Sequence, residues 1–448
     1  MKKIKTDVFI LGGGSGGMGC LYRLAKNGVK VILCDKNGGF GGTSVYSGVS
    51  CWEPGVSLDG LHLPLADELM KRGAYIGKSV SNGRLLNPEI SDDNVINDFS
   101  KYPWGLSAKD KFGKYEDTLK RCNMFFSDRL NQMRRFQFDE DYINPAMKNI
   151  LKNYENNFTA FFNTSLVSVK TEGDRVYSCT LDSGVEIEAK YFIDCGGNNI
   201  PLIRMCNCGT DLGDTDLNGV TYVFRVRKTD GNHIDDVNTP IDYSKLDPIP
   251  ISCFNIYPNG DININMLPTM TGGEYVSLGG NADEYAHALI RNYWNFLQRE
   301  KGLSGYTLIK IFNAGIRERY RLRGKHILTE EDIRQGIFSQ RNNSHIIAVG
   351  DHMLDIHGGP GLSKELDAPY GIPIECCMTN EFENLFAACC GASFSHIASS
   401  SVRLSRTMMS LGEGVGEYIS QKVLYGRVDF EKIQQSQKFN ETVNKWIK

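Results

Sequence analysis

Residues 6–35 read TDVFILGGGSGGMGCLYRLAKNGVKVILCD, and this stretch decides the fold class. Its two apolar runs, residues 6–11 and 29–34, have the length of short buried strands. Between them, apolar residues recur at helical spacing from about Ser15 to Asn27, and Gly28 follows where a helix C-cap glycine belongs. The stretch therefore predicts a βαβ unit in an α/β protein.

The turn before the expected helix carries the spacing G-x-G-x-x-G as Gly12, Gly14 and Gly17. These glycines permit a tight turn, a close approach of the backbone to a pyrophosphate, and close packing of helix on strand. Free backbone N–H groups near Ser15 and the helix dipole favour an anion. Asp35 lies 23 positions after Gly12 and can accept hydrogen bonds from a ribose. The alternative is a glycine-rich turn in an ordinary α/β unit, which the complete order of features disfavours.

Composition excludes several other classes. Of 448 residues, 41% are hydrophobic and 23% charged, which predicts two or three folded units rather than disorder. A net charge of -3 argues against a nucleic-acid binder that relies on bulk charge. No apolar run approaches the roughly 18 residues of a membrane span, and none resembles a signal core, so we expect a cytoplasmic protein without membrane contact. The 13 cysteines contain no C-x-x-C pair, and we expect reduced thiols and no metal site.

A second glycine-rich segment, residues 38–44 with the sequence GGFGGTS, follows directly after Asp35. Here the chain can pass back along a pyrophosphate and a flavin. The arrangement resembles the glutathione-reductase-type flavoproteins, whose second strand is soon followed by Gly-Gly-x-Thr/Ser. The strand-like stretches between 166 and 188 resemble the β-meander of those proteins, and the strand ending at Asp194 precedes Gly196 as their Asp-Ala-Thr-Gly strand does.

The resemblance implies FAD as the cofactor. It implies cofactor contacts at Gly12, Gly14, Ser15, Gly17, Asp35, Lys36, Gly42, Thr43, Ser44, Val167, Gly196 and Ser400.

Two later blocks narrow the resemblance. Residues 315–324, GIRERYRLRG, and residues 328–332, LTEED, are similar to the Ile-Arg-Glu-Thr-Arg-Arg and Leu-Thr-x-x-Asp signature of the FAD-dependent oxidoreductase family, a broad and largely uncharacterised bacterial group. Residues 355–358, DIHG, match its Asp-Ile-His segment, and several motifs between 370 and 416 match its C-terminal block. The chain departs from the pattern at Cys389-Cys390, where the family usually has Gly-Arg.

The expected architecture is α/β, with a discontinuous Rossmann-type FAD-binding domain over residues 1–60, 150–215 and 335–448. A β-rich substrate or cap domain would occupy residues 61–149 and 216–334, with a helix over 282–299. We expect a loop around 391–400 and then a helix from about Ser401 to Gln421. That helix would aim its positive end at the flavin, or else be a plain capped surface helix.

His357 is the first candidate for acid–base catalysis. It lies between Asp355 and the glycine-rich residues 358–361, and an imidazole titrates near neutral pH. The alternative is a structural loop histidine that is hydrogen-bonded to backbone.

Arg403 is the second catalytic candidate, because a guanidinium group binds a carboxylate or phosphate through two hydrogen bonds. Arg317 and Arg321 can act in the same way, but for these two a pairing with Glu318 or other acids is the favoured interpretation. His396 has the same two interpretations, a functional and a structural role, and the structural role is favoured. Cys51 has no partner cysteine before Cys122, which argues against a dithiol mechanism.

The sequence thus predicts a FAD-dependent oxidoreductase that transfers a hydride between flavin N5 and a small organic substrate. A second G-x-G-x-x-G unit is missing, so the electron partner is open, as are the substrate and the oligomeric state. A flavin-binding electron-transfer or non-catalytic protein is the alternative. A FAD-dependent RNA-modifying enzyme is disfavoured by the charge balance, and we expect no nucleic-acid partner.

Overall fold

The computed structural model describes residues 2–52, 60–74, 79–81, 136–212, 217–237, 251–257, 259–340, 343–357, 362–364, 366 and 368–436. Strand β1 (Lys2–Leu11), helix α1 (Ser15–Lys26) and strand β2 (Val31–Cys34) form the predicted βαβ unit, with β1 and β2 parallel. Gly28 has φ +83°, as expected of a glycine that ends a helix. β1 begins earlier than predicted because its first residues pair with β9.

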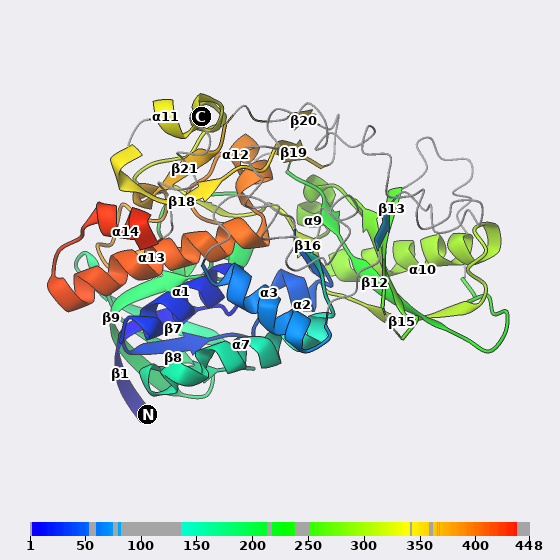
Figure 1. The fold of residues 1–448 in the computed structure, drawn as a ribbon, viewed down its shortest axis with the longest axis horizontal. Helices are drawn as coiled ribbons and strands as arrows, with labels where there is room; N and C mark the ends of the chain where they lie inside the picture. Colours follow the sequence, from blue (N-terminus) through cyan, green and yellow to red (C-terminus); the bar gives the residue numbers. More distant parts are fainter. Residues whose placement is uncertain are drawn as a thin grey trace.

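The main sheet has seven strands, in the order β6-β2-β1-β9-β8-β7 with β22 also paired to β9 (Figure 1). β6, β2, β1, β9 and β22 pair in parallel, whereas β7, β8 and β9 form the predicted antiparallel meander. The further bounds are β6 Phe158–Phe161, β7 Leu166–Glu172, β8 Arg175–Leu181, β9 Val185–Asp194 and β22 Leu385–Ala387. Because β1, β2 and β9 are parallel, the turns that follow them lie at one edge of the sheet.

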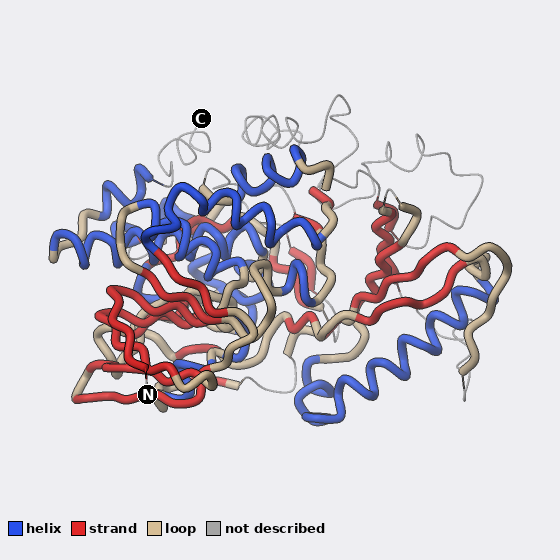
Figure 2. The backbone as a smooth tube through the Cα atoms, turned by 90° about the horizontal axis from the view of Figure 1, so that it is seen from below, coloured by secondary structure: helices blue, strands red, loops and turns tan. Residues whose placement is uncertain are grey.

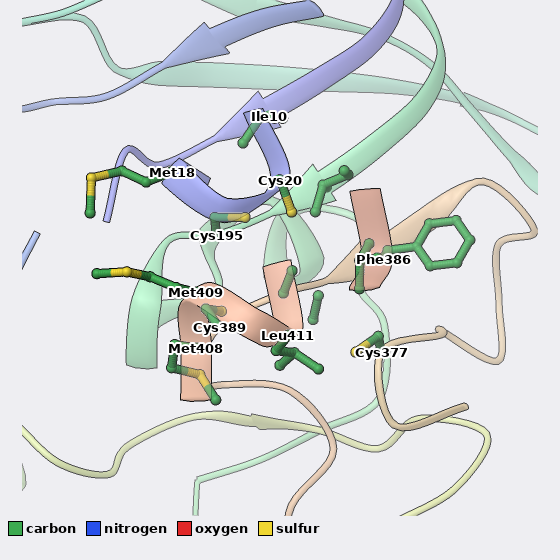
Figure 3. Packing of buried hydrophobic residues seen from close by; sticks show 14 of the residues in the cluster. Ile10, Met18, Cys20, Cys195, Cys377, Phe386, Cys389, Met408, Met409 and Leu411 are labelled. Carbon is green, nitrogen blue, oxygen red and sulfur yellow. The ribbon is translucent and has the colours of Figure 1, made fainter. Parts of the chain in front are cut away.

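Helix α13 (Ser405–Tyr425) packs against α1 through glycines (Figure 1). A Cβ atom on Gly412 would lie 2.1 Å from the carbonyl oxygen of Gly16, so the two backbones approach too closely for any side chain there. Around this contact, Cys20, Cys195 and Met409 are buried among apolar side chains (Figure 3).

The cysteines behave as small buried apolar residues. All 11 cysteines whose side chains the structure describes are free, and nine of them are buried. Burial raises the pKa of the Cys195 and Cys389 thiols. These thiols are therefore protonated at neutral pH.

A second sheet has the order β15-β12-β14-β13-β4, and the long helix α10 (Ala282–Glu300) lies along it (Figure 2). Its strands are β15 Tyr306–Ile311, β12 Val223–Lys228, β14 Ile262–Leu267, β13 Ile251–Ile256 and β4 Ser79–Ser81. Phe224, Ile264, Ile290 and Trp294 are fully buried in a core of its own between sheet and helix. The predicted helix over 282–299 is confirmed.

The β-rich stretch 220–228 is divided at Tyr222. β11 (Val220–Thr221) leaves the second sheet to pair with β16 (Gly315–Ile316), and β12 starts at Val223. The backbone N–H of Tyr222 donates to Thr269 Oγ1 instead of a strand partner, which explains the interruption. This division places Thr221 and Gly315 beside each other.

The expected start of the C-terminal helix is wrong. α12 (His396–Val402) begins before Ser401, because the Ser395 side chain accepts a hydrogen bond from Ala398 N and caps it. The chain leaves helical geometry near Leu404, and α13 then begins at Ser405. Ser400 therefore lies inside a short helix and not at the start of the long one.

Shorter elements complete the fold. The helices are α2 Thr43–Tyr46, α3 His62–Lys71, α7 Ile143–Leu151, α8 Pro201–Met205, α9 Gly272–Leu278, α11 Glu330–Ser339 and α14 Phe430–Ser436. The remaining strands are β3 Cys51–Trp52, β5 Phe136–Gln137, β10 Thr210–Asp211, β17 Arg321–Leu322, β18 Ile346–Gly350, β19 Leu354–Ile356, β20 Leu362–Lys364 and β21 Tyr370–Pro373. The inner sides of α3 and α7 belong to the core around the main sheet.

Candidate active site

The phosphate loop, residues 12–17, lies at the carboxyl end of β1. Among the described residues no side chain caps α1, and its first turn holds no acid, so its backbone N–H groups face outward for an anion. Gly12 has φ +107°, and a Cβ atom there would lie 2.4 Å from the Cys195 carbonyl oxygen. The turn therefore requires glycine at this position, as the motif predicts.

The second glycine segment, residues 38–44, lies directly against the phosphate loop. Gly41 N donates to the Gly13 carbonyl at 3.0 Å, and a Cβ atom on Gly42 would lie 2.7 Å from the Gly14 Cα. Ser44 Oγ accepts from Trp52 Nε1 at 3.1 Å and lies 3.4 Å from Ser405 Oγ, at the first residue of α13. Two glycine turns and the start of α13 thus meet.

Asp35 follows β2 at the same edge. Its Oδ2 accepts from Gly13 N at 2.5 Å and its Oδ1 from Asn37 N at 2.7 Å. Burial raises the pKa of Asp35, although these backbone hydrogen bonds lower it. The carboxylate is thereby fixed beside the phosphate loop, which fits a ribose next to a pyrophosphate. The chain's geometry, with close-packed glycines and an uncapped helix, fits FAD.

Most of the predicted cofactor residues are brought together at this edge: Gly12, Gly14, Ser15, Gly17, Asp35, Gly42, Thr43, Ser44 and Gly196. The structure gives the three others different surroundings. The Lys36 and Val167 side chains are exposed, the latter by 56%. Ser400 Oγ accepts a hydrogen bond from Asp355 N at 3.2 Å, which places it in the polar cluster described next.

The Asp355 cluster joins the two predicted catalytic residues. His357 Nε2 lies 2.7 Å from Asp355 Oδ2, and Arg403 Nη2 lies 3.3 Å from the same oxygen. Burial alone would raise the pKa of Asp355, but the hydrogen bond from His357 and the charges of His357 and Arg403 outweigh it and lower the pKa to about 2. Burial lowers the pKa of His357, and the positive charges of Arg317 and Arg403 lower it further. The hydrogen bond to Asp355 and its negative charge raise this pKa, but they do not outweigh the other effects.

Arg317 lies beside this pair. Its Nη1 donates to the Gly219 carbonyl and to Thr221 Oγ1, both at 2.7 Å, and Gly219 N donates to the His357 carbonyl at 2.5 Å. Among the described residues its hydrogen bonds go to a carbonyl and a hydroxyl, not to the acid that the sequence analysis favoured. Burial and the neighbouring Arg403 lower the pKa of Arg317 to about 9, against the attraction of Asp355.

Glu318 and Asn218 connect the cluster to its surroundings, and sequence reasoning gave Asn218 no role. Glu318 Oε2 accepts a hydrogen bond from Asn218 Nδ2 at 2.8 Å. The same oxygen lies 2.8 Å from His396 Nδ1. Asn218 Oδ1 in turn accepts from His357 N at 3.2 Å. Arg321 pairs with Glu318 and with Asp211, as the favoured interpretation predicted. Asn218 lies 139 positions from His357, so no local signal could have linked them.

Trp52 and Cys390 have structural surroundings. The Trp52 ring is buried against His62 and Phe138, with ring centroids 4.8 and 4.4 Å apart, so it fills the core. Cys390 Sγ lies 3.7 Å from the Arg403 carbonyl oxygen. In the described part of the chain, no group of three or more His, Cys, Asp or Glu side chains has the geometry of a metal site, and no helix is long and apolar enough to cross a membrane.

Comparison with known proteins shows the family of this chain. The model of a family described as FAD dependent oxidoreductase matches residues 7–437. A 3-oxosteroid 1-dehydrogenase from Rhodococcus opacus is 40% identical over 54 residues, which are 12% of this chain and 11% of that enzyme. The chain thus matches about a tenth of the length of this curated relative.

Two solved structures were compared with the chain, and the first of them shares its fold. A geranylgeranyl bacteriochlorophyll reductase-like protein from Thermoplasma acidophilum is 12% identical and superposes with a TM-score of 0.51, over 99% of this chain and 87% of the other. A myxobacterial chondrochloren halogenase, a FAD-dependent halogenase, is 14% identical with a TM-score of 0.47, over 97% and 78% of the two chains.

Proposed function

This chain belongs to the FAD dependent oxidoreductase family, and from that premise we propose that it transfers a hydride between a small organic molecule and flavin N5, with His357 as the acid–base group. The observation that carries the proposal is the 2.7 Å contact between His357 Nε2 and a carboxylate that Arg403 also contacts. A histidine oriented by a half-buried acid is an arrangement that suits proton transfer.

In this proposal the two glycine turns hold the cofactor. The N–H groups of the phosphate loop and of the first turn of α1 bind the pyrophosphate, and Asp35 binds the adenosine ribose. Gly42 allows the backbone to approach the cofactor closely, and Thr43 and Ser44 line the flavin side of the same segment. When bound, FAD supplies a ring nitrogen that accepts or gives a hydride.

The start of α13 takes the place that the sequence analysis assigned to a helix beginning at Ser401. Among the described residues no side chain caps α13, and its first residue lies 3.4 Å from Ser44. Its free N–H groups would stabilise negative charge near the flavin ring.

His357 moves the proton. Because Asp355 contacts Nε2, the neutral imidazole carries its hydrogen on Nε2 and its lone pair on Nδ1. The lowered pKa of His357 keeps this neutral form at physiological pH. When a substrate C–H bond breaks with its electron pair, Nδ1 accepts the proton from the adjacent oxygen or nitrogen. Reduction of a substrate uses the same path in reverse.

In the proposal each of the two hydrophobic cores supports a different role, cofactor binding or substrate binding. The FAD-binding domain would occupy residues 1–60, 150–215 and 335–448, and the second sheet with α10 would cover the substrate. α3 and α7 fall outside these cofactor ranges but pack in the core of the main sheet, so in the proposal they brace the cofactor domain.

The test begins with an absorbance spectrum of the purified protein, followed by an anaerobic screen for compounds that bleach or restore the flavin. We expect a yellow protein whose flavin one class of small molecule reduces. His357→Ala should retain the flavin and lose about 10²–10⁴-fold in the reduction rate, the usual contribution of an acid–base group. Full flavin occupancy with no bleaching by any organic compound would instead indicate an electron-transfer protein, and a wild-type rate in His357→Ala would remove the histidine from the mechanism.

A further inference from the structure

We propose that Arg317 and Arg403 bind a carboxylate group of the substrate beside His357, so that the substrate is an organic acid. The inference rests on the proposed function, because it places the substrate at the same histidine. The inference adds the chemical class of the substrate, which the proposed function does not specify.

The first argument is the charge balance of the cluster. With its imidazole neutral, His357 is surrounded by two guanidinium groups, Arg317 and Arg403, and by one carboxylate, Asp355, which leaves one positive charge without an acid partner among the described residues. The neighbouring Arg321 is paired with Glu318 and Asp211. A half-buried cation without a counter-ion is costly, and a bound monoanion removes that cost.

The second argument is the hydrogen-bonding capacity of the arginines. The Nε atom of Arg403 is buried and has no acceptor among the described residues. Arg317 uses Nη1 for both of its recorded hydrogen bonds, to Gly219 and Thr221. These two bonds hold the guanidinium plane, and the opposite edge, Nε and Nη2, has the spacing that matches two carboxylate oxygens.

The third argument is position. Gly219 links Arg317 to His357, since its carbonyl accepts from the arginine and its N–H donates to the His357 carbonyl. Gly315, two residues before Arg317, lies against Ser47, three residues after the second glycine segment, and a Cβ atom on Gly315 would lie 3.7 Å from the Ser47 Cβ. The arginine therefore stands between the acid–base residue and the segment that we assign to the flavin.

The cluster also remains open to solvent. The side chains of Asp355, His357 and His396 are 23%, 27% and 30% exposed. A small molecule can therefore reach the arginines without unfolding the surrounding elements. A purely structural ion cluster would not require this opening.

Charge favours a carboxylate over a phosphate. A single surplus positive charge matches a monoanion. A phosphate dianion would bring a second negative charge close to Asp355 and Glu318, both of which are already paired with arginines. Repulsion from these carboxylates disfavours the dianion.

The experiment titrates the flavin-loaded protein with benzoate, with benzamide as the neutral analogue of the same shape, and with inorganic phosphate, all at constant ionic strength. Binding is followed by the change in the visible flavin spectrum and by the melting temperature. The variants are Arg317→Gln and, as a matched control, Arg334→Gln, an exposed arginine that pairs with Glu330 on α11. Thr221→Val, which removes one acceptor of Arg317 Nη1, serves if Arg317→Gln does not fold.

We expect saturable binding of benzoate and none of benzamide. Arg317→Gln should weaken benzoate binding about 10- to 100-fold, the usual effect of losing a charged hydrogen bond, and Thr221→Val a few-fold. Arg334→Gln should match the wild type. The inference fails if a yellow protein binds benzamide as well as benzoate, if phosphate binds more tightly, if no carboxylate response appears, or if Arg317→Gln and Thr221→Val both bind benzoate normally. A colourless protein that cannot be loaded with flavin overturns the proposed function instead.

Discussion

Replacing Asp355 with asparagine tests how this carboxylate controls His357. The amide oxygen still accepts the Nε2–H of the neutral imidazole, but the negative charge that stabilises the imidazolium is lost. A hydrogen bond to a charged group contributes about 1.5–3 kcal/mol, and the low end applies because the pair is partly exposed. At about 1.4 kcal/mol per unit, the pKa of His357 should fall by about one further unit.

The same substitution has a stability effect with a defined pH range. The pKa of Asp355 is lowered from 3.8 to about 2, so the carboxylate stabilises the folded state above pH 4. This shift corresponds to about 2 kcal/mol in the free energy of unfolding, which is lost as the pH falls from about 4 towards 2. Asp355→Asn should therefore be less stable than the wild type at neutral pH, and the difference should shrink as the pH approaches 2.

The assay is an NMR titration of the His357 ring in the flavin-loaded protein, with denaturant unfolding at pH 7 and pH 3. Asp67→Asn is the matched control, since Asp67 is an exposed acid that pairs with Lys71 on α3. An unchanged or higher His357 pKa in Asp355→Asn would refute the reasoning, as would an equal shift in Asp67→Asn. Loss of flavin in Asp355→Asn would show that the carboxylate also supports the cofactor site.

Three further substitutions test the fold and the cofactor site. Gly42→Ala should abolish stoichiometric flavin binding while leaving the circular dichroism spectrum intact, because its Cβ would lie 2.7 Å from the Gly14 Cα; a full flavin content would contradict this packing. Gly412→Ala should lower the free energy of unfolding by about 1–3 kcal/mol, measured by denaturant titration, because α13 must move away from α1, and a stabilised variant would disprove that contact. Cys51→Ser should keep the rate of flavin reduction within about twofold, measured by anaerobic stopped flow, and a loss of tenfold or more would restore a thiol mechanism.

Sequence reasoning was most accurate where structure depends on nearby residues. Residues 6–35 predicted β1, α1 and β2 because apolar spacing and glycine positions act within a few turns of chain. The meander after residue 166 and the helix α10 were found for the same reason. The start of α12 was missed because Ser395, not the run of serines that follows, is the cap.

The polar cluster shows the limit of that reasoning. The sequence singled out His357 and Arg403 individually, but it favoured an acid partner for Arg317, whose hydrogen bonds go to Gly219 and Thr221. Asn218 carries no motif, yet it links His357 to Glu318. Only the packing of the β11–β16 pair beside α12 decides these contacts.

The amino-acid sequence by itself determined the βαβ unit, the two glycine turns and the acid at the end of β2, since backbone geometry and short-range hydrogen bonding specify each of them. The tertiary structure alone decided that α13 lies against α1 and that two arginine-bearing segments, those of Arg317 and Arg403, lie beside His357. Those contacts join residues 48 to 390 positions apart, and their free energy depends on the mutual packing of whole sheets and helices.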